Sequence, residues 1–276
     1  MIEIRNPVHP KDFKTYTTEK IRQEFLIQQL FVPGVVRLVY THFDRMIAGG
    51  VCPDKPLTLE GGKEIGADFF LQRREMGVIN VGPKGTITVD GKKYPLDTKD
   101  GLYVGMGARE IVFSSEDPRC PAHFYLNSCP AHASHPTVKI AIGDIEKVHL
   151  GSPQESNVRT INKYVHPLGV QSCQLVMGMT VLEPGSIWNS MPCHTHERRM
   201  EIYFYFNLPE NSVVFHLMGE PEETRHVVIR NEEAVISPSW SLHSGAGTSN
   251  YTFIWGMIGE NQTFTDMDAV PMARLK

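Results

Sequence analysis

The sequence predicts a mostly β protein with two jelly-roll-like β-barrels and a short N-terminal helix. Short runs of β-branched and aromatic residues recur along the 276 residues and are separated by Gly, Pro and Asp turns. This pattern is typical of sandwiches and barrels. The order of the runs in the first half recurs in the second half, which indicates an internal repeat. Each half is therefore expected to form one barrel.

The expected elements follow one another from the N-terminus. Helical periodicity covers residues 19–30, where four apolar residues fall on one face, and a Pro-Gly pair at 33–34 ends the helix. Strands follow, with hairpin turns at residues 82–85 and 90–91. The expected strands are 35–40, 46–48, 76–81, 86–89, 102–104, 111–113 and 123–126 in the first half, and 173–181, 200–206, 212–218, 226–229, 235–236 and 252–258 in the second.

The internal repeat predicts how the chain divides. The matching segments are 73–81 with 198–205, 93–104 with 225–237, and 123–126 with 251–254. In this alignment Gly77 stands where the second half has Glu201. We expect residues 1–150 to form an N-terminal barrel without metal ligands and residues 151–276 to form a metal-binding barrel, joined through a polar stretch.

Three histidines and one glutamate of the second half have the spacing of a single metal site. Alternate side chains on a β-strand point to the same side, so His194 and His196 direct two imidazoles into one space. Residues 200–206 should form a strand that returns Glu201 beside them, and His243 follows a short strand and a proline-initiated turn. These nitrogen and oxygen ligands suit zinc, iron, manganese or nickel, with a position left open for substrate.

Other histidines and cysteines offer alternatives to this site. The chain has 12 His and 5 Cys, so one His-x-His pair is expected by chance, but the glutamate and third histidine favour a metal site. Cys193 adjoins His194, and adjacent strand residues point to opposite sides, which argues against Cys193 as a ligand. Cys129, His132 and His135 lie in a Pro, Ala and Ser-rich loop without a second ligand pair, which favours an ordinary loop.

Composition limits the classes of partner and the compartment. The formal net charge is −4, which gives no general attraction for nucleic acid or an anionic membrane, so small-molecule partners are expected. No apolar stretch approaches the roughly 18 residues that a membrane span needs. The five cysteines are odd in number and scattered, which fits a reducing compartment. We therefore expect a cytoplasmic protein.

Two motifs of the second half resemble those of the cupin superfamily. The first is His194-x-His196-x(4)-Glu201, and the second is Pro238-x(4)-His243. Residues 191–201, 235–241 and 251–256 further resemble the family of 4-deoxy-L-threo-5-hexosulose-uronate ketol-isomerases, also called 5-keto-4-deoxyuronate isomerases. This similarity extends over essentially the whole chain.

The resemblance implies a bicupin fold and a role in pectin and uronate degradation. It implies an intramolecular oxidoreductase that converts 5-dehydro-4-deoxy-D-glucuronate to 3-deoxy-D-glycero-2,5-hexodiulosonate. The implied cofactor is one Zn²⁺ per chain, held by His194, His196, Glu201 and His243. The resemblance also implies a homohexamer, whereas the sequence alone does not show how many chains assemble.

Ketol isomerisation needs a proton to leave carbon and an enediolate to be stabilised, and a divalent ion serves the second need. The catalytic acid or base is not identified by the sequence. Tyr203 and Tyr205 share the strand side of Glu201, so they are candidates to orient or protonate the substrate, or they line the barrel. Arg198 and Arg199 are candidates to bind the substrate carboxylate, or they are solvated surface charges.

Two functions of other classes remain open. An iron or nickel dioxygenase would use the same four ligands and would consume oxygen. A cupin that binds a sugar without catalysis would show saturable binding and no turnover.

Overall fold

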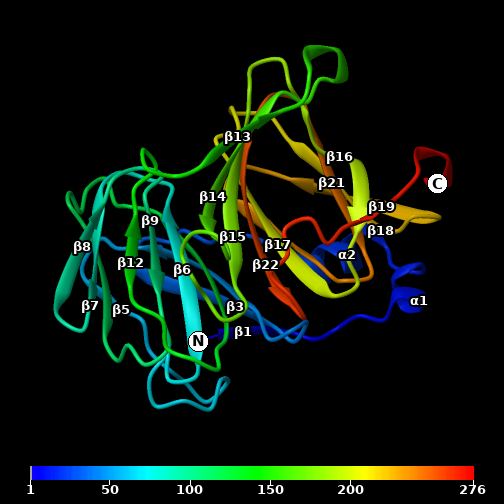
Figure 1. The fold of residues 1–276 in the computed structure, drawn as a ribbon. Helices are drawn as coiled ribbons and strands as arrows, with labels where there is room; N and C mark the ends of the chain where they lie inside the picture. Colours follow the sequence, from blue (N-terminus) through cyan, green and yellow to red (C-terminus); the bar gives the residue numbers. More distant parts are fainter. Residues whose placement is uncertain (1) are drawn as a thin grey trace. The chain divides into compact units, whose positions relative to one another are not determined.

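The computed structural model describes residues 2–276, and the chain consists mostly of β-strands (Figure 1). It divides into two compact units. The first contains residues 2–5, Gln29–Ile145 and Tyr164–Met177, and the second contains Asn6–Gln28, Glu146–Lys163 and Gly178–Lys276. The predicted mostly β fold is confirmed. The sequence predicted one division after residue 150, whereas in the structure each unit also takes a short segment from the other half.

The first unit contains two sheets. The larger has the order β1 (Ile2–Arg5), β3 (Val35–Thr41), β4 (Ile47–Cys52), β11 (Phe124–Pro130), β6 (Arg74–Asn80), β9 (Gly101–Val104) and β12 (Val138–Ile140). The smaller has the order β5 (Leu57–Thr58), β10 (Ile111–Ser115), β7 (Gly85–Val89) and β8 (Lys92–Leu96). One buried cluster joins Val78 and Leu102 of the larger sheet to Ile87 and Phe113 of the smaller. The two sheets therefore pack as a sandwich.

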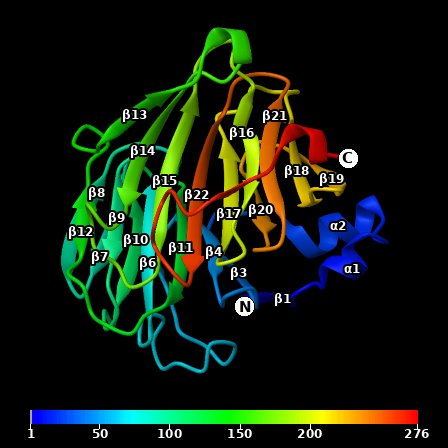
Figure 2. The ribbon, with the colours of Figure 1, turned by 45° about the vertical axis from the view of Figure 1, so that its right-hand side comes forward.

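The second unit also contains two sheets. The larger has the order β13 (Lys147–Leu150), β14 (Arg159–Val165), β15 (Val176–Leu182), β22 (Thr252–Gly259), β17 (Arg199–Phe206), β20 (Glu233–Ser237) and β2 (Leu26–Ile27). The smaller has the order β19 (Glu223–Ile229), β18 (Val214–Glu220), β21 (Leu242–Gly247), β16 (Trp188–Thr195) and β23 (Asp268–Ala269). Figure 2 shows β14, β15 and β22 side by side. The strand orders are open, so these sheets form sandwiches and not closed barrels.

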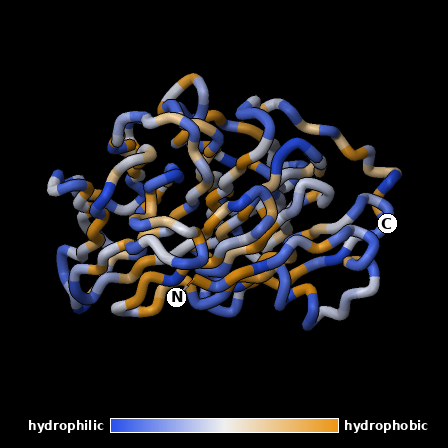
Figure 3. The backbone as a smooth tube through the Cα atoms, turned by 90° about the horizontal axis from the view of Figure 1, so that it is seen from below, coloured by the Kyte–Doolittle hydropathy of each residue, from blue (hydrophilic) through white to orange (hydrophobic). Residues whose placement is uncertain are grey.

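Local sequence explains why these strands form. Hydrophobic and hydrophilic segments are interspersed along the chain (Figure 3), and in β7 buried residues alternate with half-buried ones. Asp90 and Gly91 have φ of +47° and +82°, which is the backbone of a tight hairpin turn, and β7 pairs with β8 across it. The hairpin predicted at these residues is confirmed.

The predicted helix over residues 19–30 is too long. The structure has α1 (Pro10–Phe13) and α2 (Thr18–Phe25), with the Thr17 hydroxyl accepting from the Lys20 N–H at the start of α2. Leu26 and Ile27 then form β2 and pair with β20. Apolar residues continue past the helix because they belong to a sheet, which sequence periodicity did not distinguish. The 3₁₀ helices are η1 (Pro153–Glu155) and η2 (Met272–Arg274). No helix within residues 2–276 has the length and apolar character to span a membrane.

The larger sheets of the two units share one strand order, which gives a structural alignment of the repeat. In the first unit Met76 pairs with Ser128 and with Val104, the last residue of β9. In the second unit Glu201 pairs with Met257 and with Ser237, the last residue of β20. Met76 therefore occupies the position of Glu201, one residue from the Gly77 that the sequence alignment placed there.

Candidate metal centre

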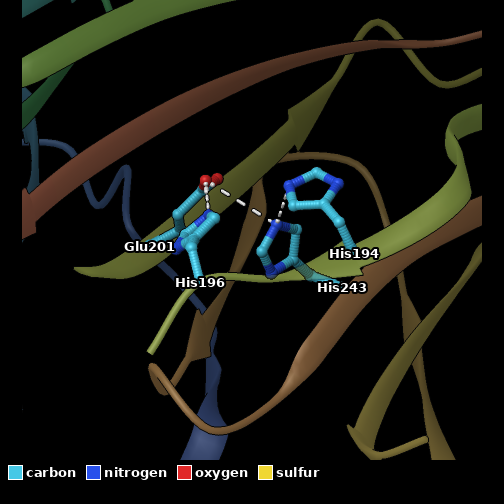
Figure 4. A group of neighbouring side chains, drawn as sticks. All are labelled: His194, His196, Glu201 and His243. Carbon is cyan, nitrogen blue, oxygen red and sulfur yellow. Dashed lines mark hydrogen bonds and ion pairs between the residues drawn. The ribbon is translucent and has the colours of Figure 1, made fainter. Parts of the chain in front are cut away.

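The four predicted metal ligands lie together in the second unit (Figure 4). His194 is on β16, Glu201 is on β17 and His243 is on β21, while His196 directly follows β16. His194 and His243 are paired across the two strands. One possible ligand atom from each of the four residues lies within 4.8 Å of the others. His196, Glu201 and His243 are 2%, 4% and 1% exposed, whereas His194 is half-buried.

Hydrogen bonds direct the inner atoms of these residues toward one another. The Nδ1 atom of His196 lies 3.0 Å from the carbonyl oxygen of Arg199, which can only accept, so Nδ1 carries the proton. The inner Nε2 then faces the Glu201 carboxylate at 2.7 Å. Two acceptors cannot approach this closely without a proton or a cation between them. Nδ1 of His243 lies 3.3 Å from the Ser237 hydroxyl, which leaves its Nε2 facing inward.

The inner atoms of His194 and His243 also face the same small space. Their Nε2 atoms are 3.0 Å apart, and His243 Nε2 is 3.7 Å from Glu201 Oε1. Three imidazole nitrogens and one carboxylate, aimed at one small space and oriented by outer hydrogen bonds, fit the donor set of a divalent transition metal. The residues present therefore fit a metal ion.

Burial and mutual charge set the protonation of the group. Burial lowers the pKa of His194 to about 4 and holds the pKa of His243 well below its usual value. Burial alone would raise the pKa of Glu201, but the three imidazoles outweigh it and lower that pKa to about 2. Burial acts to lower the pKa of His196, and its contact with Glu201 overcomes this and raises it. Near neutral pH Glu201 is thus an anionic carboxylate beside the neutral imidazoles of His194 and His243, which suits metal binding, whereas Glu201 favours the protonated form of His196.

A cavity of about 440 Å³ lies beside the group. His194, His196 and Glu201 form part of its wall. Much of the rest is apolar, with Trp255 and Phe264 among the lining residues. Such a cavity can hold a small organic molecule next to the four residues.

The two candidate tyrosines differ in position. Tyr203 lines the cavity, and its hydroxyl lies 3.3 Å from the Ser190 hydroxyl. Burial, followed by the charge of Glu201, raises the pKa of Tyr203 well above its usual value. Tyr205 is not among the lining residues, and its hydroxyl is bonded to Nδ1 of the buried His216 at 2.8 Å. Strand alternation placed both tyrosines on one side of the strand, but it did not indicate which of them reaches the cavity.

The two candidate arginines also differ in position relative to the cavity. Arg198 does not line the cavity, and its guanidinium binds Asp266 and Asp268 at 2.8 Å. Arg199 is buried and lines the cavity, with Nη2 donating to the Asp266 carbonyl at 2.8 Å. The Nε and Nη1 atoms of Arg199 have no hydrogen-bond partner among the described residues. Of the pair, only Arg199 is placed to meet a ligand.

Comparison with known proteins identifies the family. The sequence model of the KduI/IolB family matches residues 25–272. The chain belongs to the KduI/IolB family. It is 59% identical over 276 residues, 100% of both chains, to the 4-deoxy-L-threo-5-hexosulose-uronate ketol-isomerase of Caldicellulosiruptor bescii.

Solved structures support the fold of this KduI/IolB family chain. An IolB-like protein from Salmonella typhimurium matches with a TM-score of 0.67 and 13% identity, covering 82% of this chain and 86% of its own. Oxalate decarboxylase from Bacillus subtilis matches with a TM-score of 0.53 and 8% identity, covering 80% of this chain and 70% of its own. At these identities the matches concern the fold alone, and the predicted cupin-like fold is confirmed.

Sequence reasoning missed some of the cavity wall of this KduI/IolB family member. Arg159 of β14 lines the cavity, but it is far from the histidines in sequence and belongs to no motif. Ser190 also lines the cavity. Cys193 does so too, although strand alternation predicted that it points away, and it packs with Leu242 and Val270. The rival residue Cys129 is buried in the first unit and donates to Glu75 at 3.4 Å.

Proposed function

We propose that this chain catalyses the ketol isomerisation of 5-dehydro-4-deoxy-D-glucuronate to 3-deoxy-D-glycero-2,5-hexodiulosonate. One observation carries the proposal: the chain is 59% identical, over its full length, to a protein named for ketol isomerisation of this uronate class. The four converging residues beside a cavity of about 440 Å³ support it, because the cavity has room for a six-carbon acid next to them.

We infer that His194, His196, Glu201 and His243 hold one Zn²⁺ per chain. Zinc is chosen because it accepts imidazole and carboxylate ligands and is not redox-active, which suits an internal proton transfer. When bound, the ion supplies Lewis acidity that stabilises negative charge developing on the substrate oxygens. The outer bonds from Arg199 and Ser237 orient His196 and His243 for this role.

The other cavity residues have separate tasks in this proposal. Arg199 binds the substrate carboxylate, because its guanidinium is buried at the cavity and has two nitrogens without partners. Tyr203 donates its phenol hydrogen bond to a substrate oxygen, since its hydroxyl lies at the wall beside Ser190. The apolar side chains of Trp255 and Phe264 exclude water, which strengthens these polar contacts.

We also propose that the reaction belongs to pectin and uronate degradation in the cytoplasm. All five cysteines are free thiols, which is consistent with a reducing compartment. The assembly proposed by resemblance is a homohexamer, and light scattering of the purified protein measures it directly.

The proposed function predicts an anaerobic, zinc-dependent activity. Purified protein should convert the unsaturated-uronate breakdown product without oxygen, lose activity after chelation, and regain it on addition of Zn²⁺. His243→Ala should lower metal content and turnover together while the protein stays folded. Metal analysis, an anaerobic assay and circular dichroism measure the three effects.

Different outcomes point to different functions. Consumption of oxygen and a requirement for iron or nickel would favour a dioxygenase. Saturable binding of the uronate without turnover would favour a non-catalytic sugar-binding protein. Full metal content and full turnover in His243→Ala would refute the ligand assignment.

A further inference from the structure

We propose that the first unit holds a second ligand site, in which Arg74 binds the carboxylate of a small organic acid that has an apolar body. The site is a cavity of about 300 Å³. Arg74, Arg73 and Tyr40 form its polar part. All three belong to the first unit. The four candidate metal ligands, His194, His196, Glu201 and His243, which we call the metal group, belong to the second. The proposed site is therefore distinct from the one that carries the proposed isomerase reaction.

Arg74 is a buried cation that lacks an anionic partner. Only 6% of the residue is exposed. Its Nε donates to the Ser128 hydroxyl at 3.2 Å, and its Nη2 donates to the carbonyls of Arg45 and Ser128 at 2.6 and 2.8 Å. Within residues 2–276, no carboxylate forms an ion pair with Arg74, and its other side-chain contact is with Tyr40. Burial lowers the pKa of this guanidinium, which reflects the cost of leaving the charge uncompensated.

The neighbouring carboxylate of Glu75 does not neutralise Arg74. Glu75 accepts hydrogen bonds from the backbone N–H groups of Cys173, Gln174 and Leu175 at 2.7 to 2.9 Å. Adjacent residues on a strand point to opposite faces of the sheet, so the two side chains do not meet. A buried charge is costly unless it is paired. An anion in the adjoining cavity would supply the missing partner.

The cavity wall indicates the chemistry of the rest of the ligand. The guanidinium carbon of Arg74 lies 5.6 Å from the ring centroid of Tyr40. The remaining lining residues are Ile65, Ala67, Pro130 and Ala131, together with Arg73. Side chains of the first four cannot hydrogen-bond sugar hydroxyls, so they favour an apolar body over a sugar acid. A planar guanidinium binds a carboxylate through two parallel hydrogen bonds, which favours that anion.

The internal repeat gives independent support. Arg74 pairs with Pro130 at the end of β11, and Arg199 pairs with Gly259 at the end of β22. The two arginines therefore occupy equivalent sheet positions, and each is buried and lines a cavity of its own unit. In the first unit the position of Glu201 is taken by the buried Met76. The first unit thus keeps an arginine, Arg74, at its cavity, and it has the apolar Met76 at the position where the second unit has Glu201.

Benzoate tests the proposal, with benzamide as a neutral probe of the same shape. Calorimetric titration of the full-length, zinc-loaded protein should show benzoate binding that is at least about tenfold tighter than benzamide binding, because a charge-assisted hydrogen bond is lost with the amide. Arg74→Gln should weaken benzoate binding by about tenfold or more. The control variant Arg274→Gln removes an exposed arginine that pairs with Glu222 and lines neither cavity, and it should leave this binding unchanged.

Two further measurements keep the test decisive if Arg74→Gln fails to fold. Crystals of the wild-type protein soaked with 4-bromobenzoate should show the anomalous signal of bromine in the cavity beside Arg74. Ala67→Phe fills the cavity without changing the charge and should also block benzoate. The proposal is overturned if benzoate does not bind or if benzamide binds equally well. It is also overturned if Ala67→Phe, or a folded Arg74→Gln, binds benzoate as the wild type does. In the crystals, bromine only at the metal group or on the protein surface would overturn it as well. Because isomerase activity is not used as a readout, these results are independent of the proposed reaction.

Discussion

At the residue scale, the candidate metal centre depends on the outer atoms of the imidazoles as much as on the inner ones. The Arg199 carbonyl fixes the proton of His196 on Nδ1, and the Ser237 hydroxyl engages Nδ1 of His243. These bonds leave both Nε2 atoms facing the Glu201 carboxylate. The sequence indicated which residues converge, but the protonation of each ring is decided by neighbours such as Ser237, which lies outside the His-x-His motif.

The two neighbouring tyrosines provide a residue-scale prediction. Tyr203→Phe removes the one phenol hydroxyl of the pair that reaches the cavity wall. We expect kcat to fall by about a hundredfold or more, in the range for loss of a positioned proton donor. Metal content should not change. Steady-state kinetics together with metal analysis measure both quantities.

Tyr205→Phe is the matched control, because it removes the same atom from the same strand. The Tyr205 hydroxyl is bonded to buried His216 away from the cavity. This variant should lose some stability and keep its kcat. Equal losses of kcat in the two variants would contradict a direct role for Tyr203.

At the element scale, strand pairing assembles the site from distant segments. The pairing of β16 with β21 sets His194 opposite His243, and β17 brings Glu201 beside them. Residues 261–268 form a further part of the wall, which we call the strap, and Phe264, Thr265 and Met267 of this segment line the cavity.

The strap is fastened by the arginine that does not reach the cavity. Nε of Arg198 donates to both carboxylate oxygens of Asp266 at 3.0 and 2.9 Å, and Nη2 contacts Asp268 at 2.8 Å. Asp266 also accepts from Asn261 at 2.6 Å, and its carbonyl accepts from Arg199. Arg198 is therefore a positioning residue for the wall near Arg199.

Arg198→Gln provides the element-scale prediction. Loss of both ion pairs should loosen the strap and raise the Michaelis constant for the uronate several-fold, while kcat stays nearly unchanged because the metal group is untouched. Arg274→Gln is the control, since it breaks another exposed ion pair, with Glu222. Similar kinetic constants for Arg198→Gln and wild type would contradict this role for the strap.

At the scale of the whole molecule, one sheet order is used twice with different contents. The larger sheet of each unit has seven strands in a corresponding order. At equivalent positions of these sheets, the first unit has Met76 and the second has Glu201. Met76 is part of the buried apolar cluster of its unit, together with Val104 and Phe70. Hydrophobic packing thus fills the place that the four candidate metal ligands have in the other unit.

This difference predicts how the first unit responds to a carboxylate. Met76→Glu buries an acid among apolar side chains, so the free energy of unfolding should fall by about 3 kcal/mol or more. Met76→Leu conserves volume and should cost less than about 1.5 kcal/mol. Urea denaturation measures both variants. Wild-type stability of Met76→Glu would show that this position is not an apolar core position.

The sequence by itself determined the mostly β class, most of the strands and the four convergent residues. These features are local: alternation of side chains along a strand, turn residues such as Asp90 and Gly91, and the spacing of His194 and His196. Each depends on residues only a few positions apart, so the covalent chain carries the information.

The tertiary structure decided the features that depend on long-range pairing. Helix α2 ends at Phe25 because Leu26 and Ile27 join β20, some two hundred residues away, and helical periodicity does not encode that partner. The tertiary structure likewise placed Tyr203 and Arg199 at the cavity, and Tyr205 and Arg198 away from it. Residues with similar local sequence thus meet different neighbours in the folded chain. Packing, not sequence spacing, therefore selected which candidates reach the cavity.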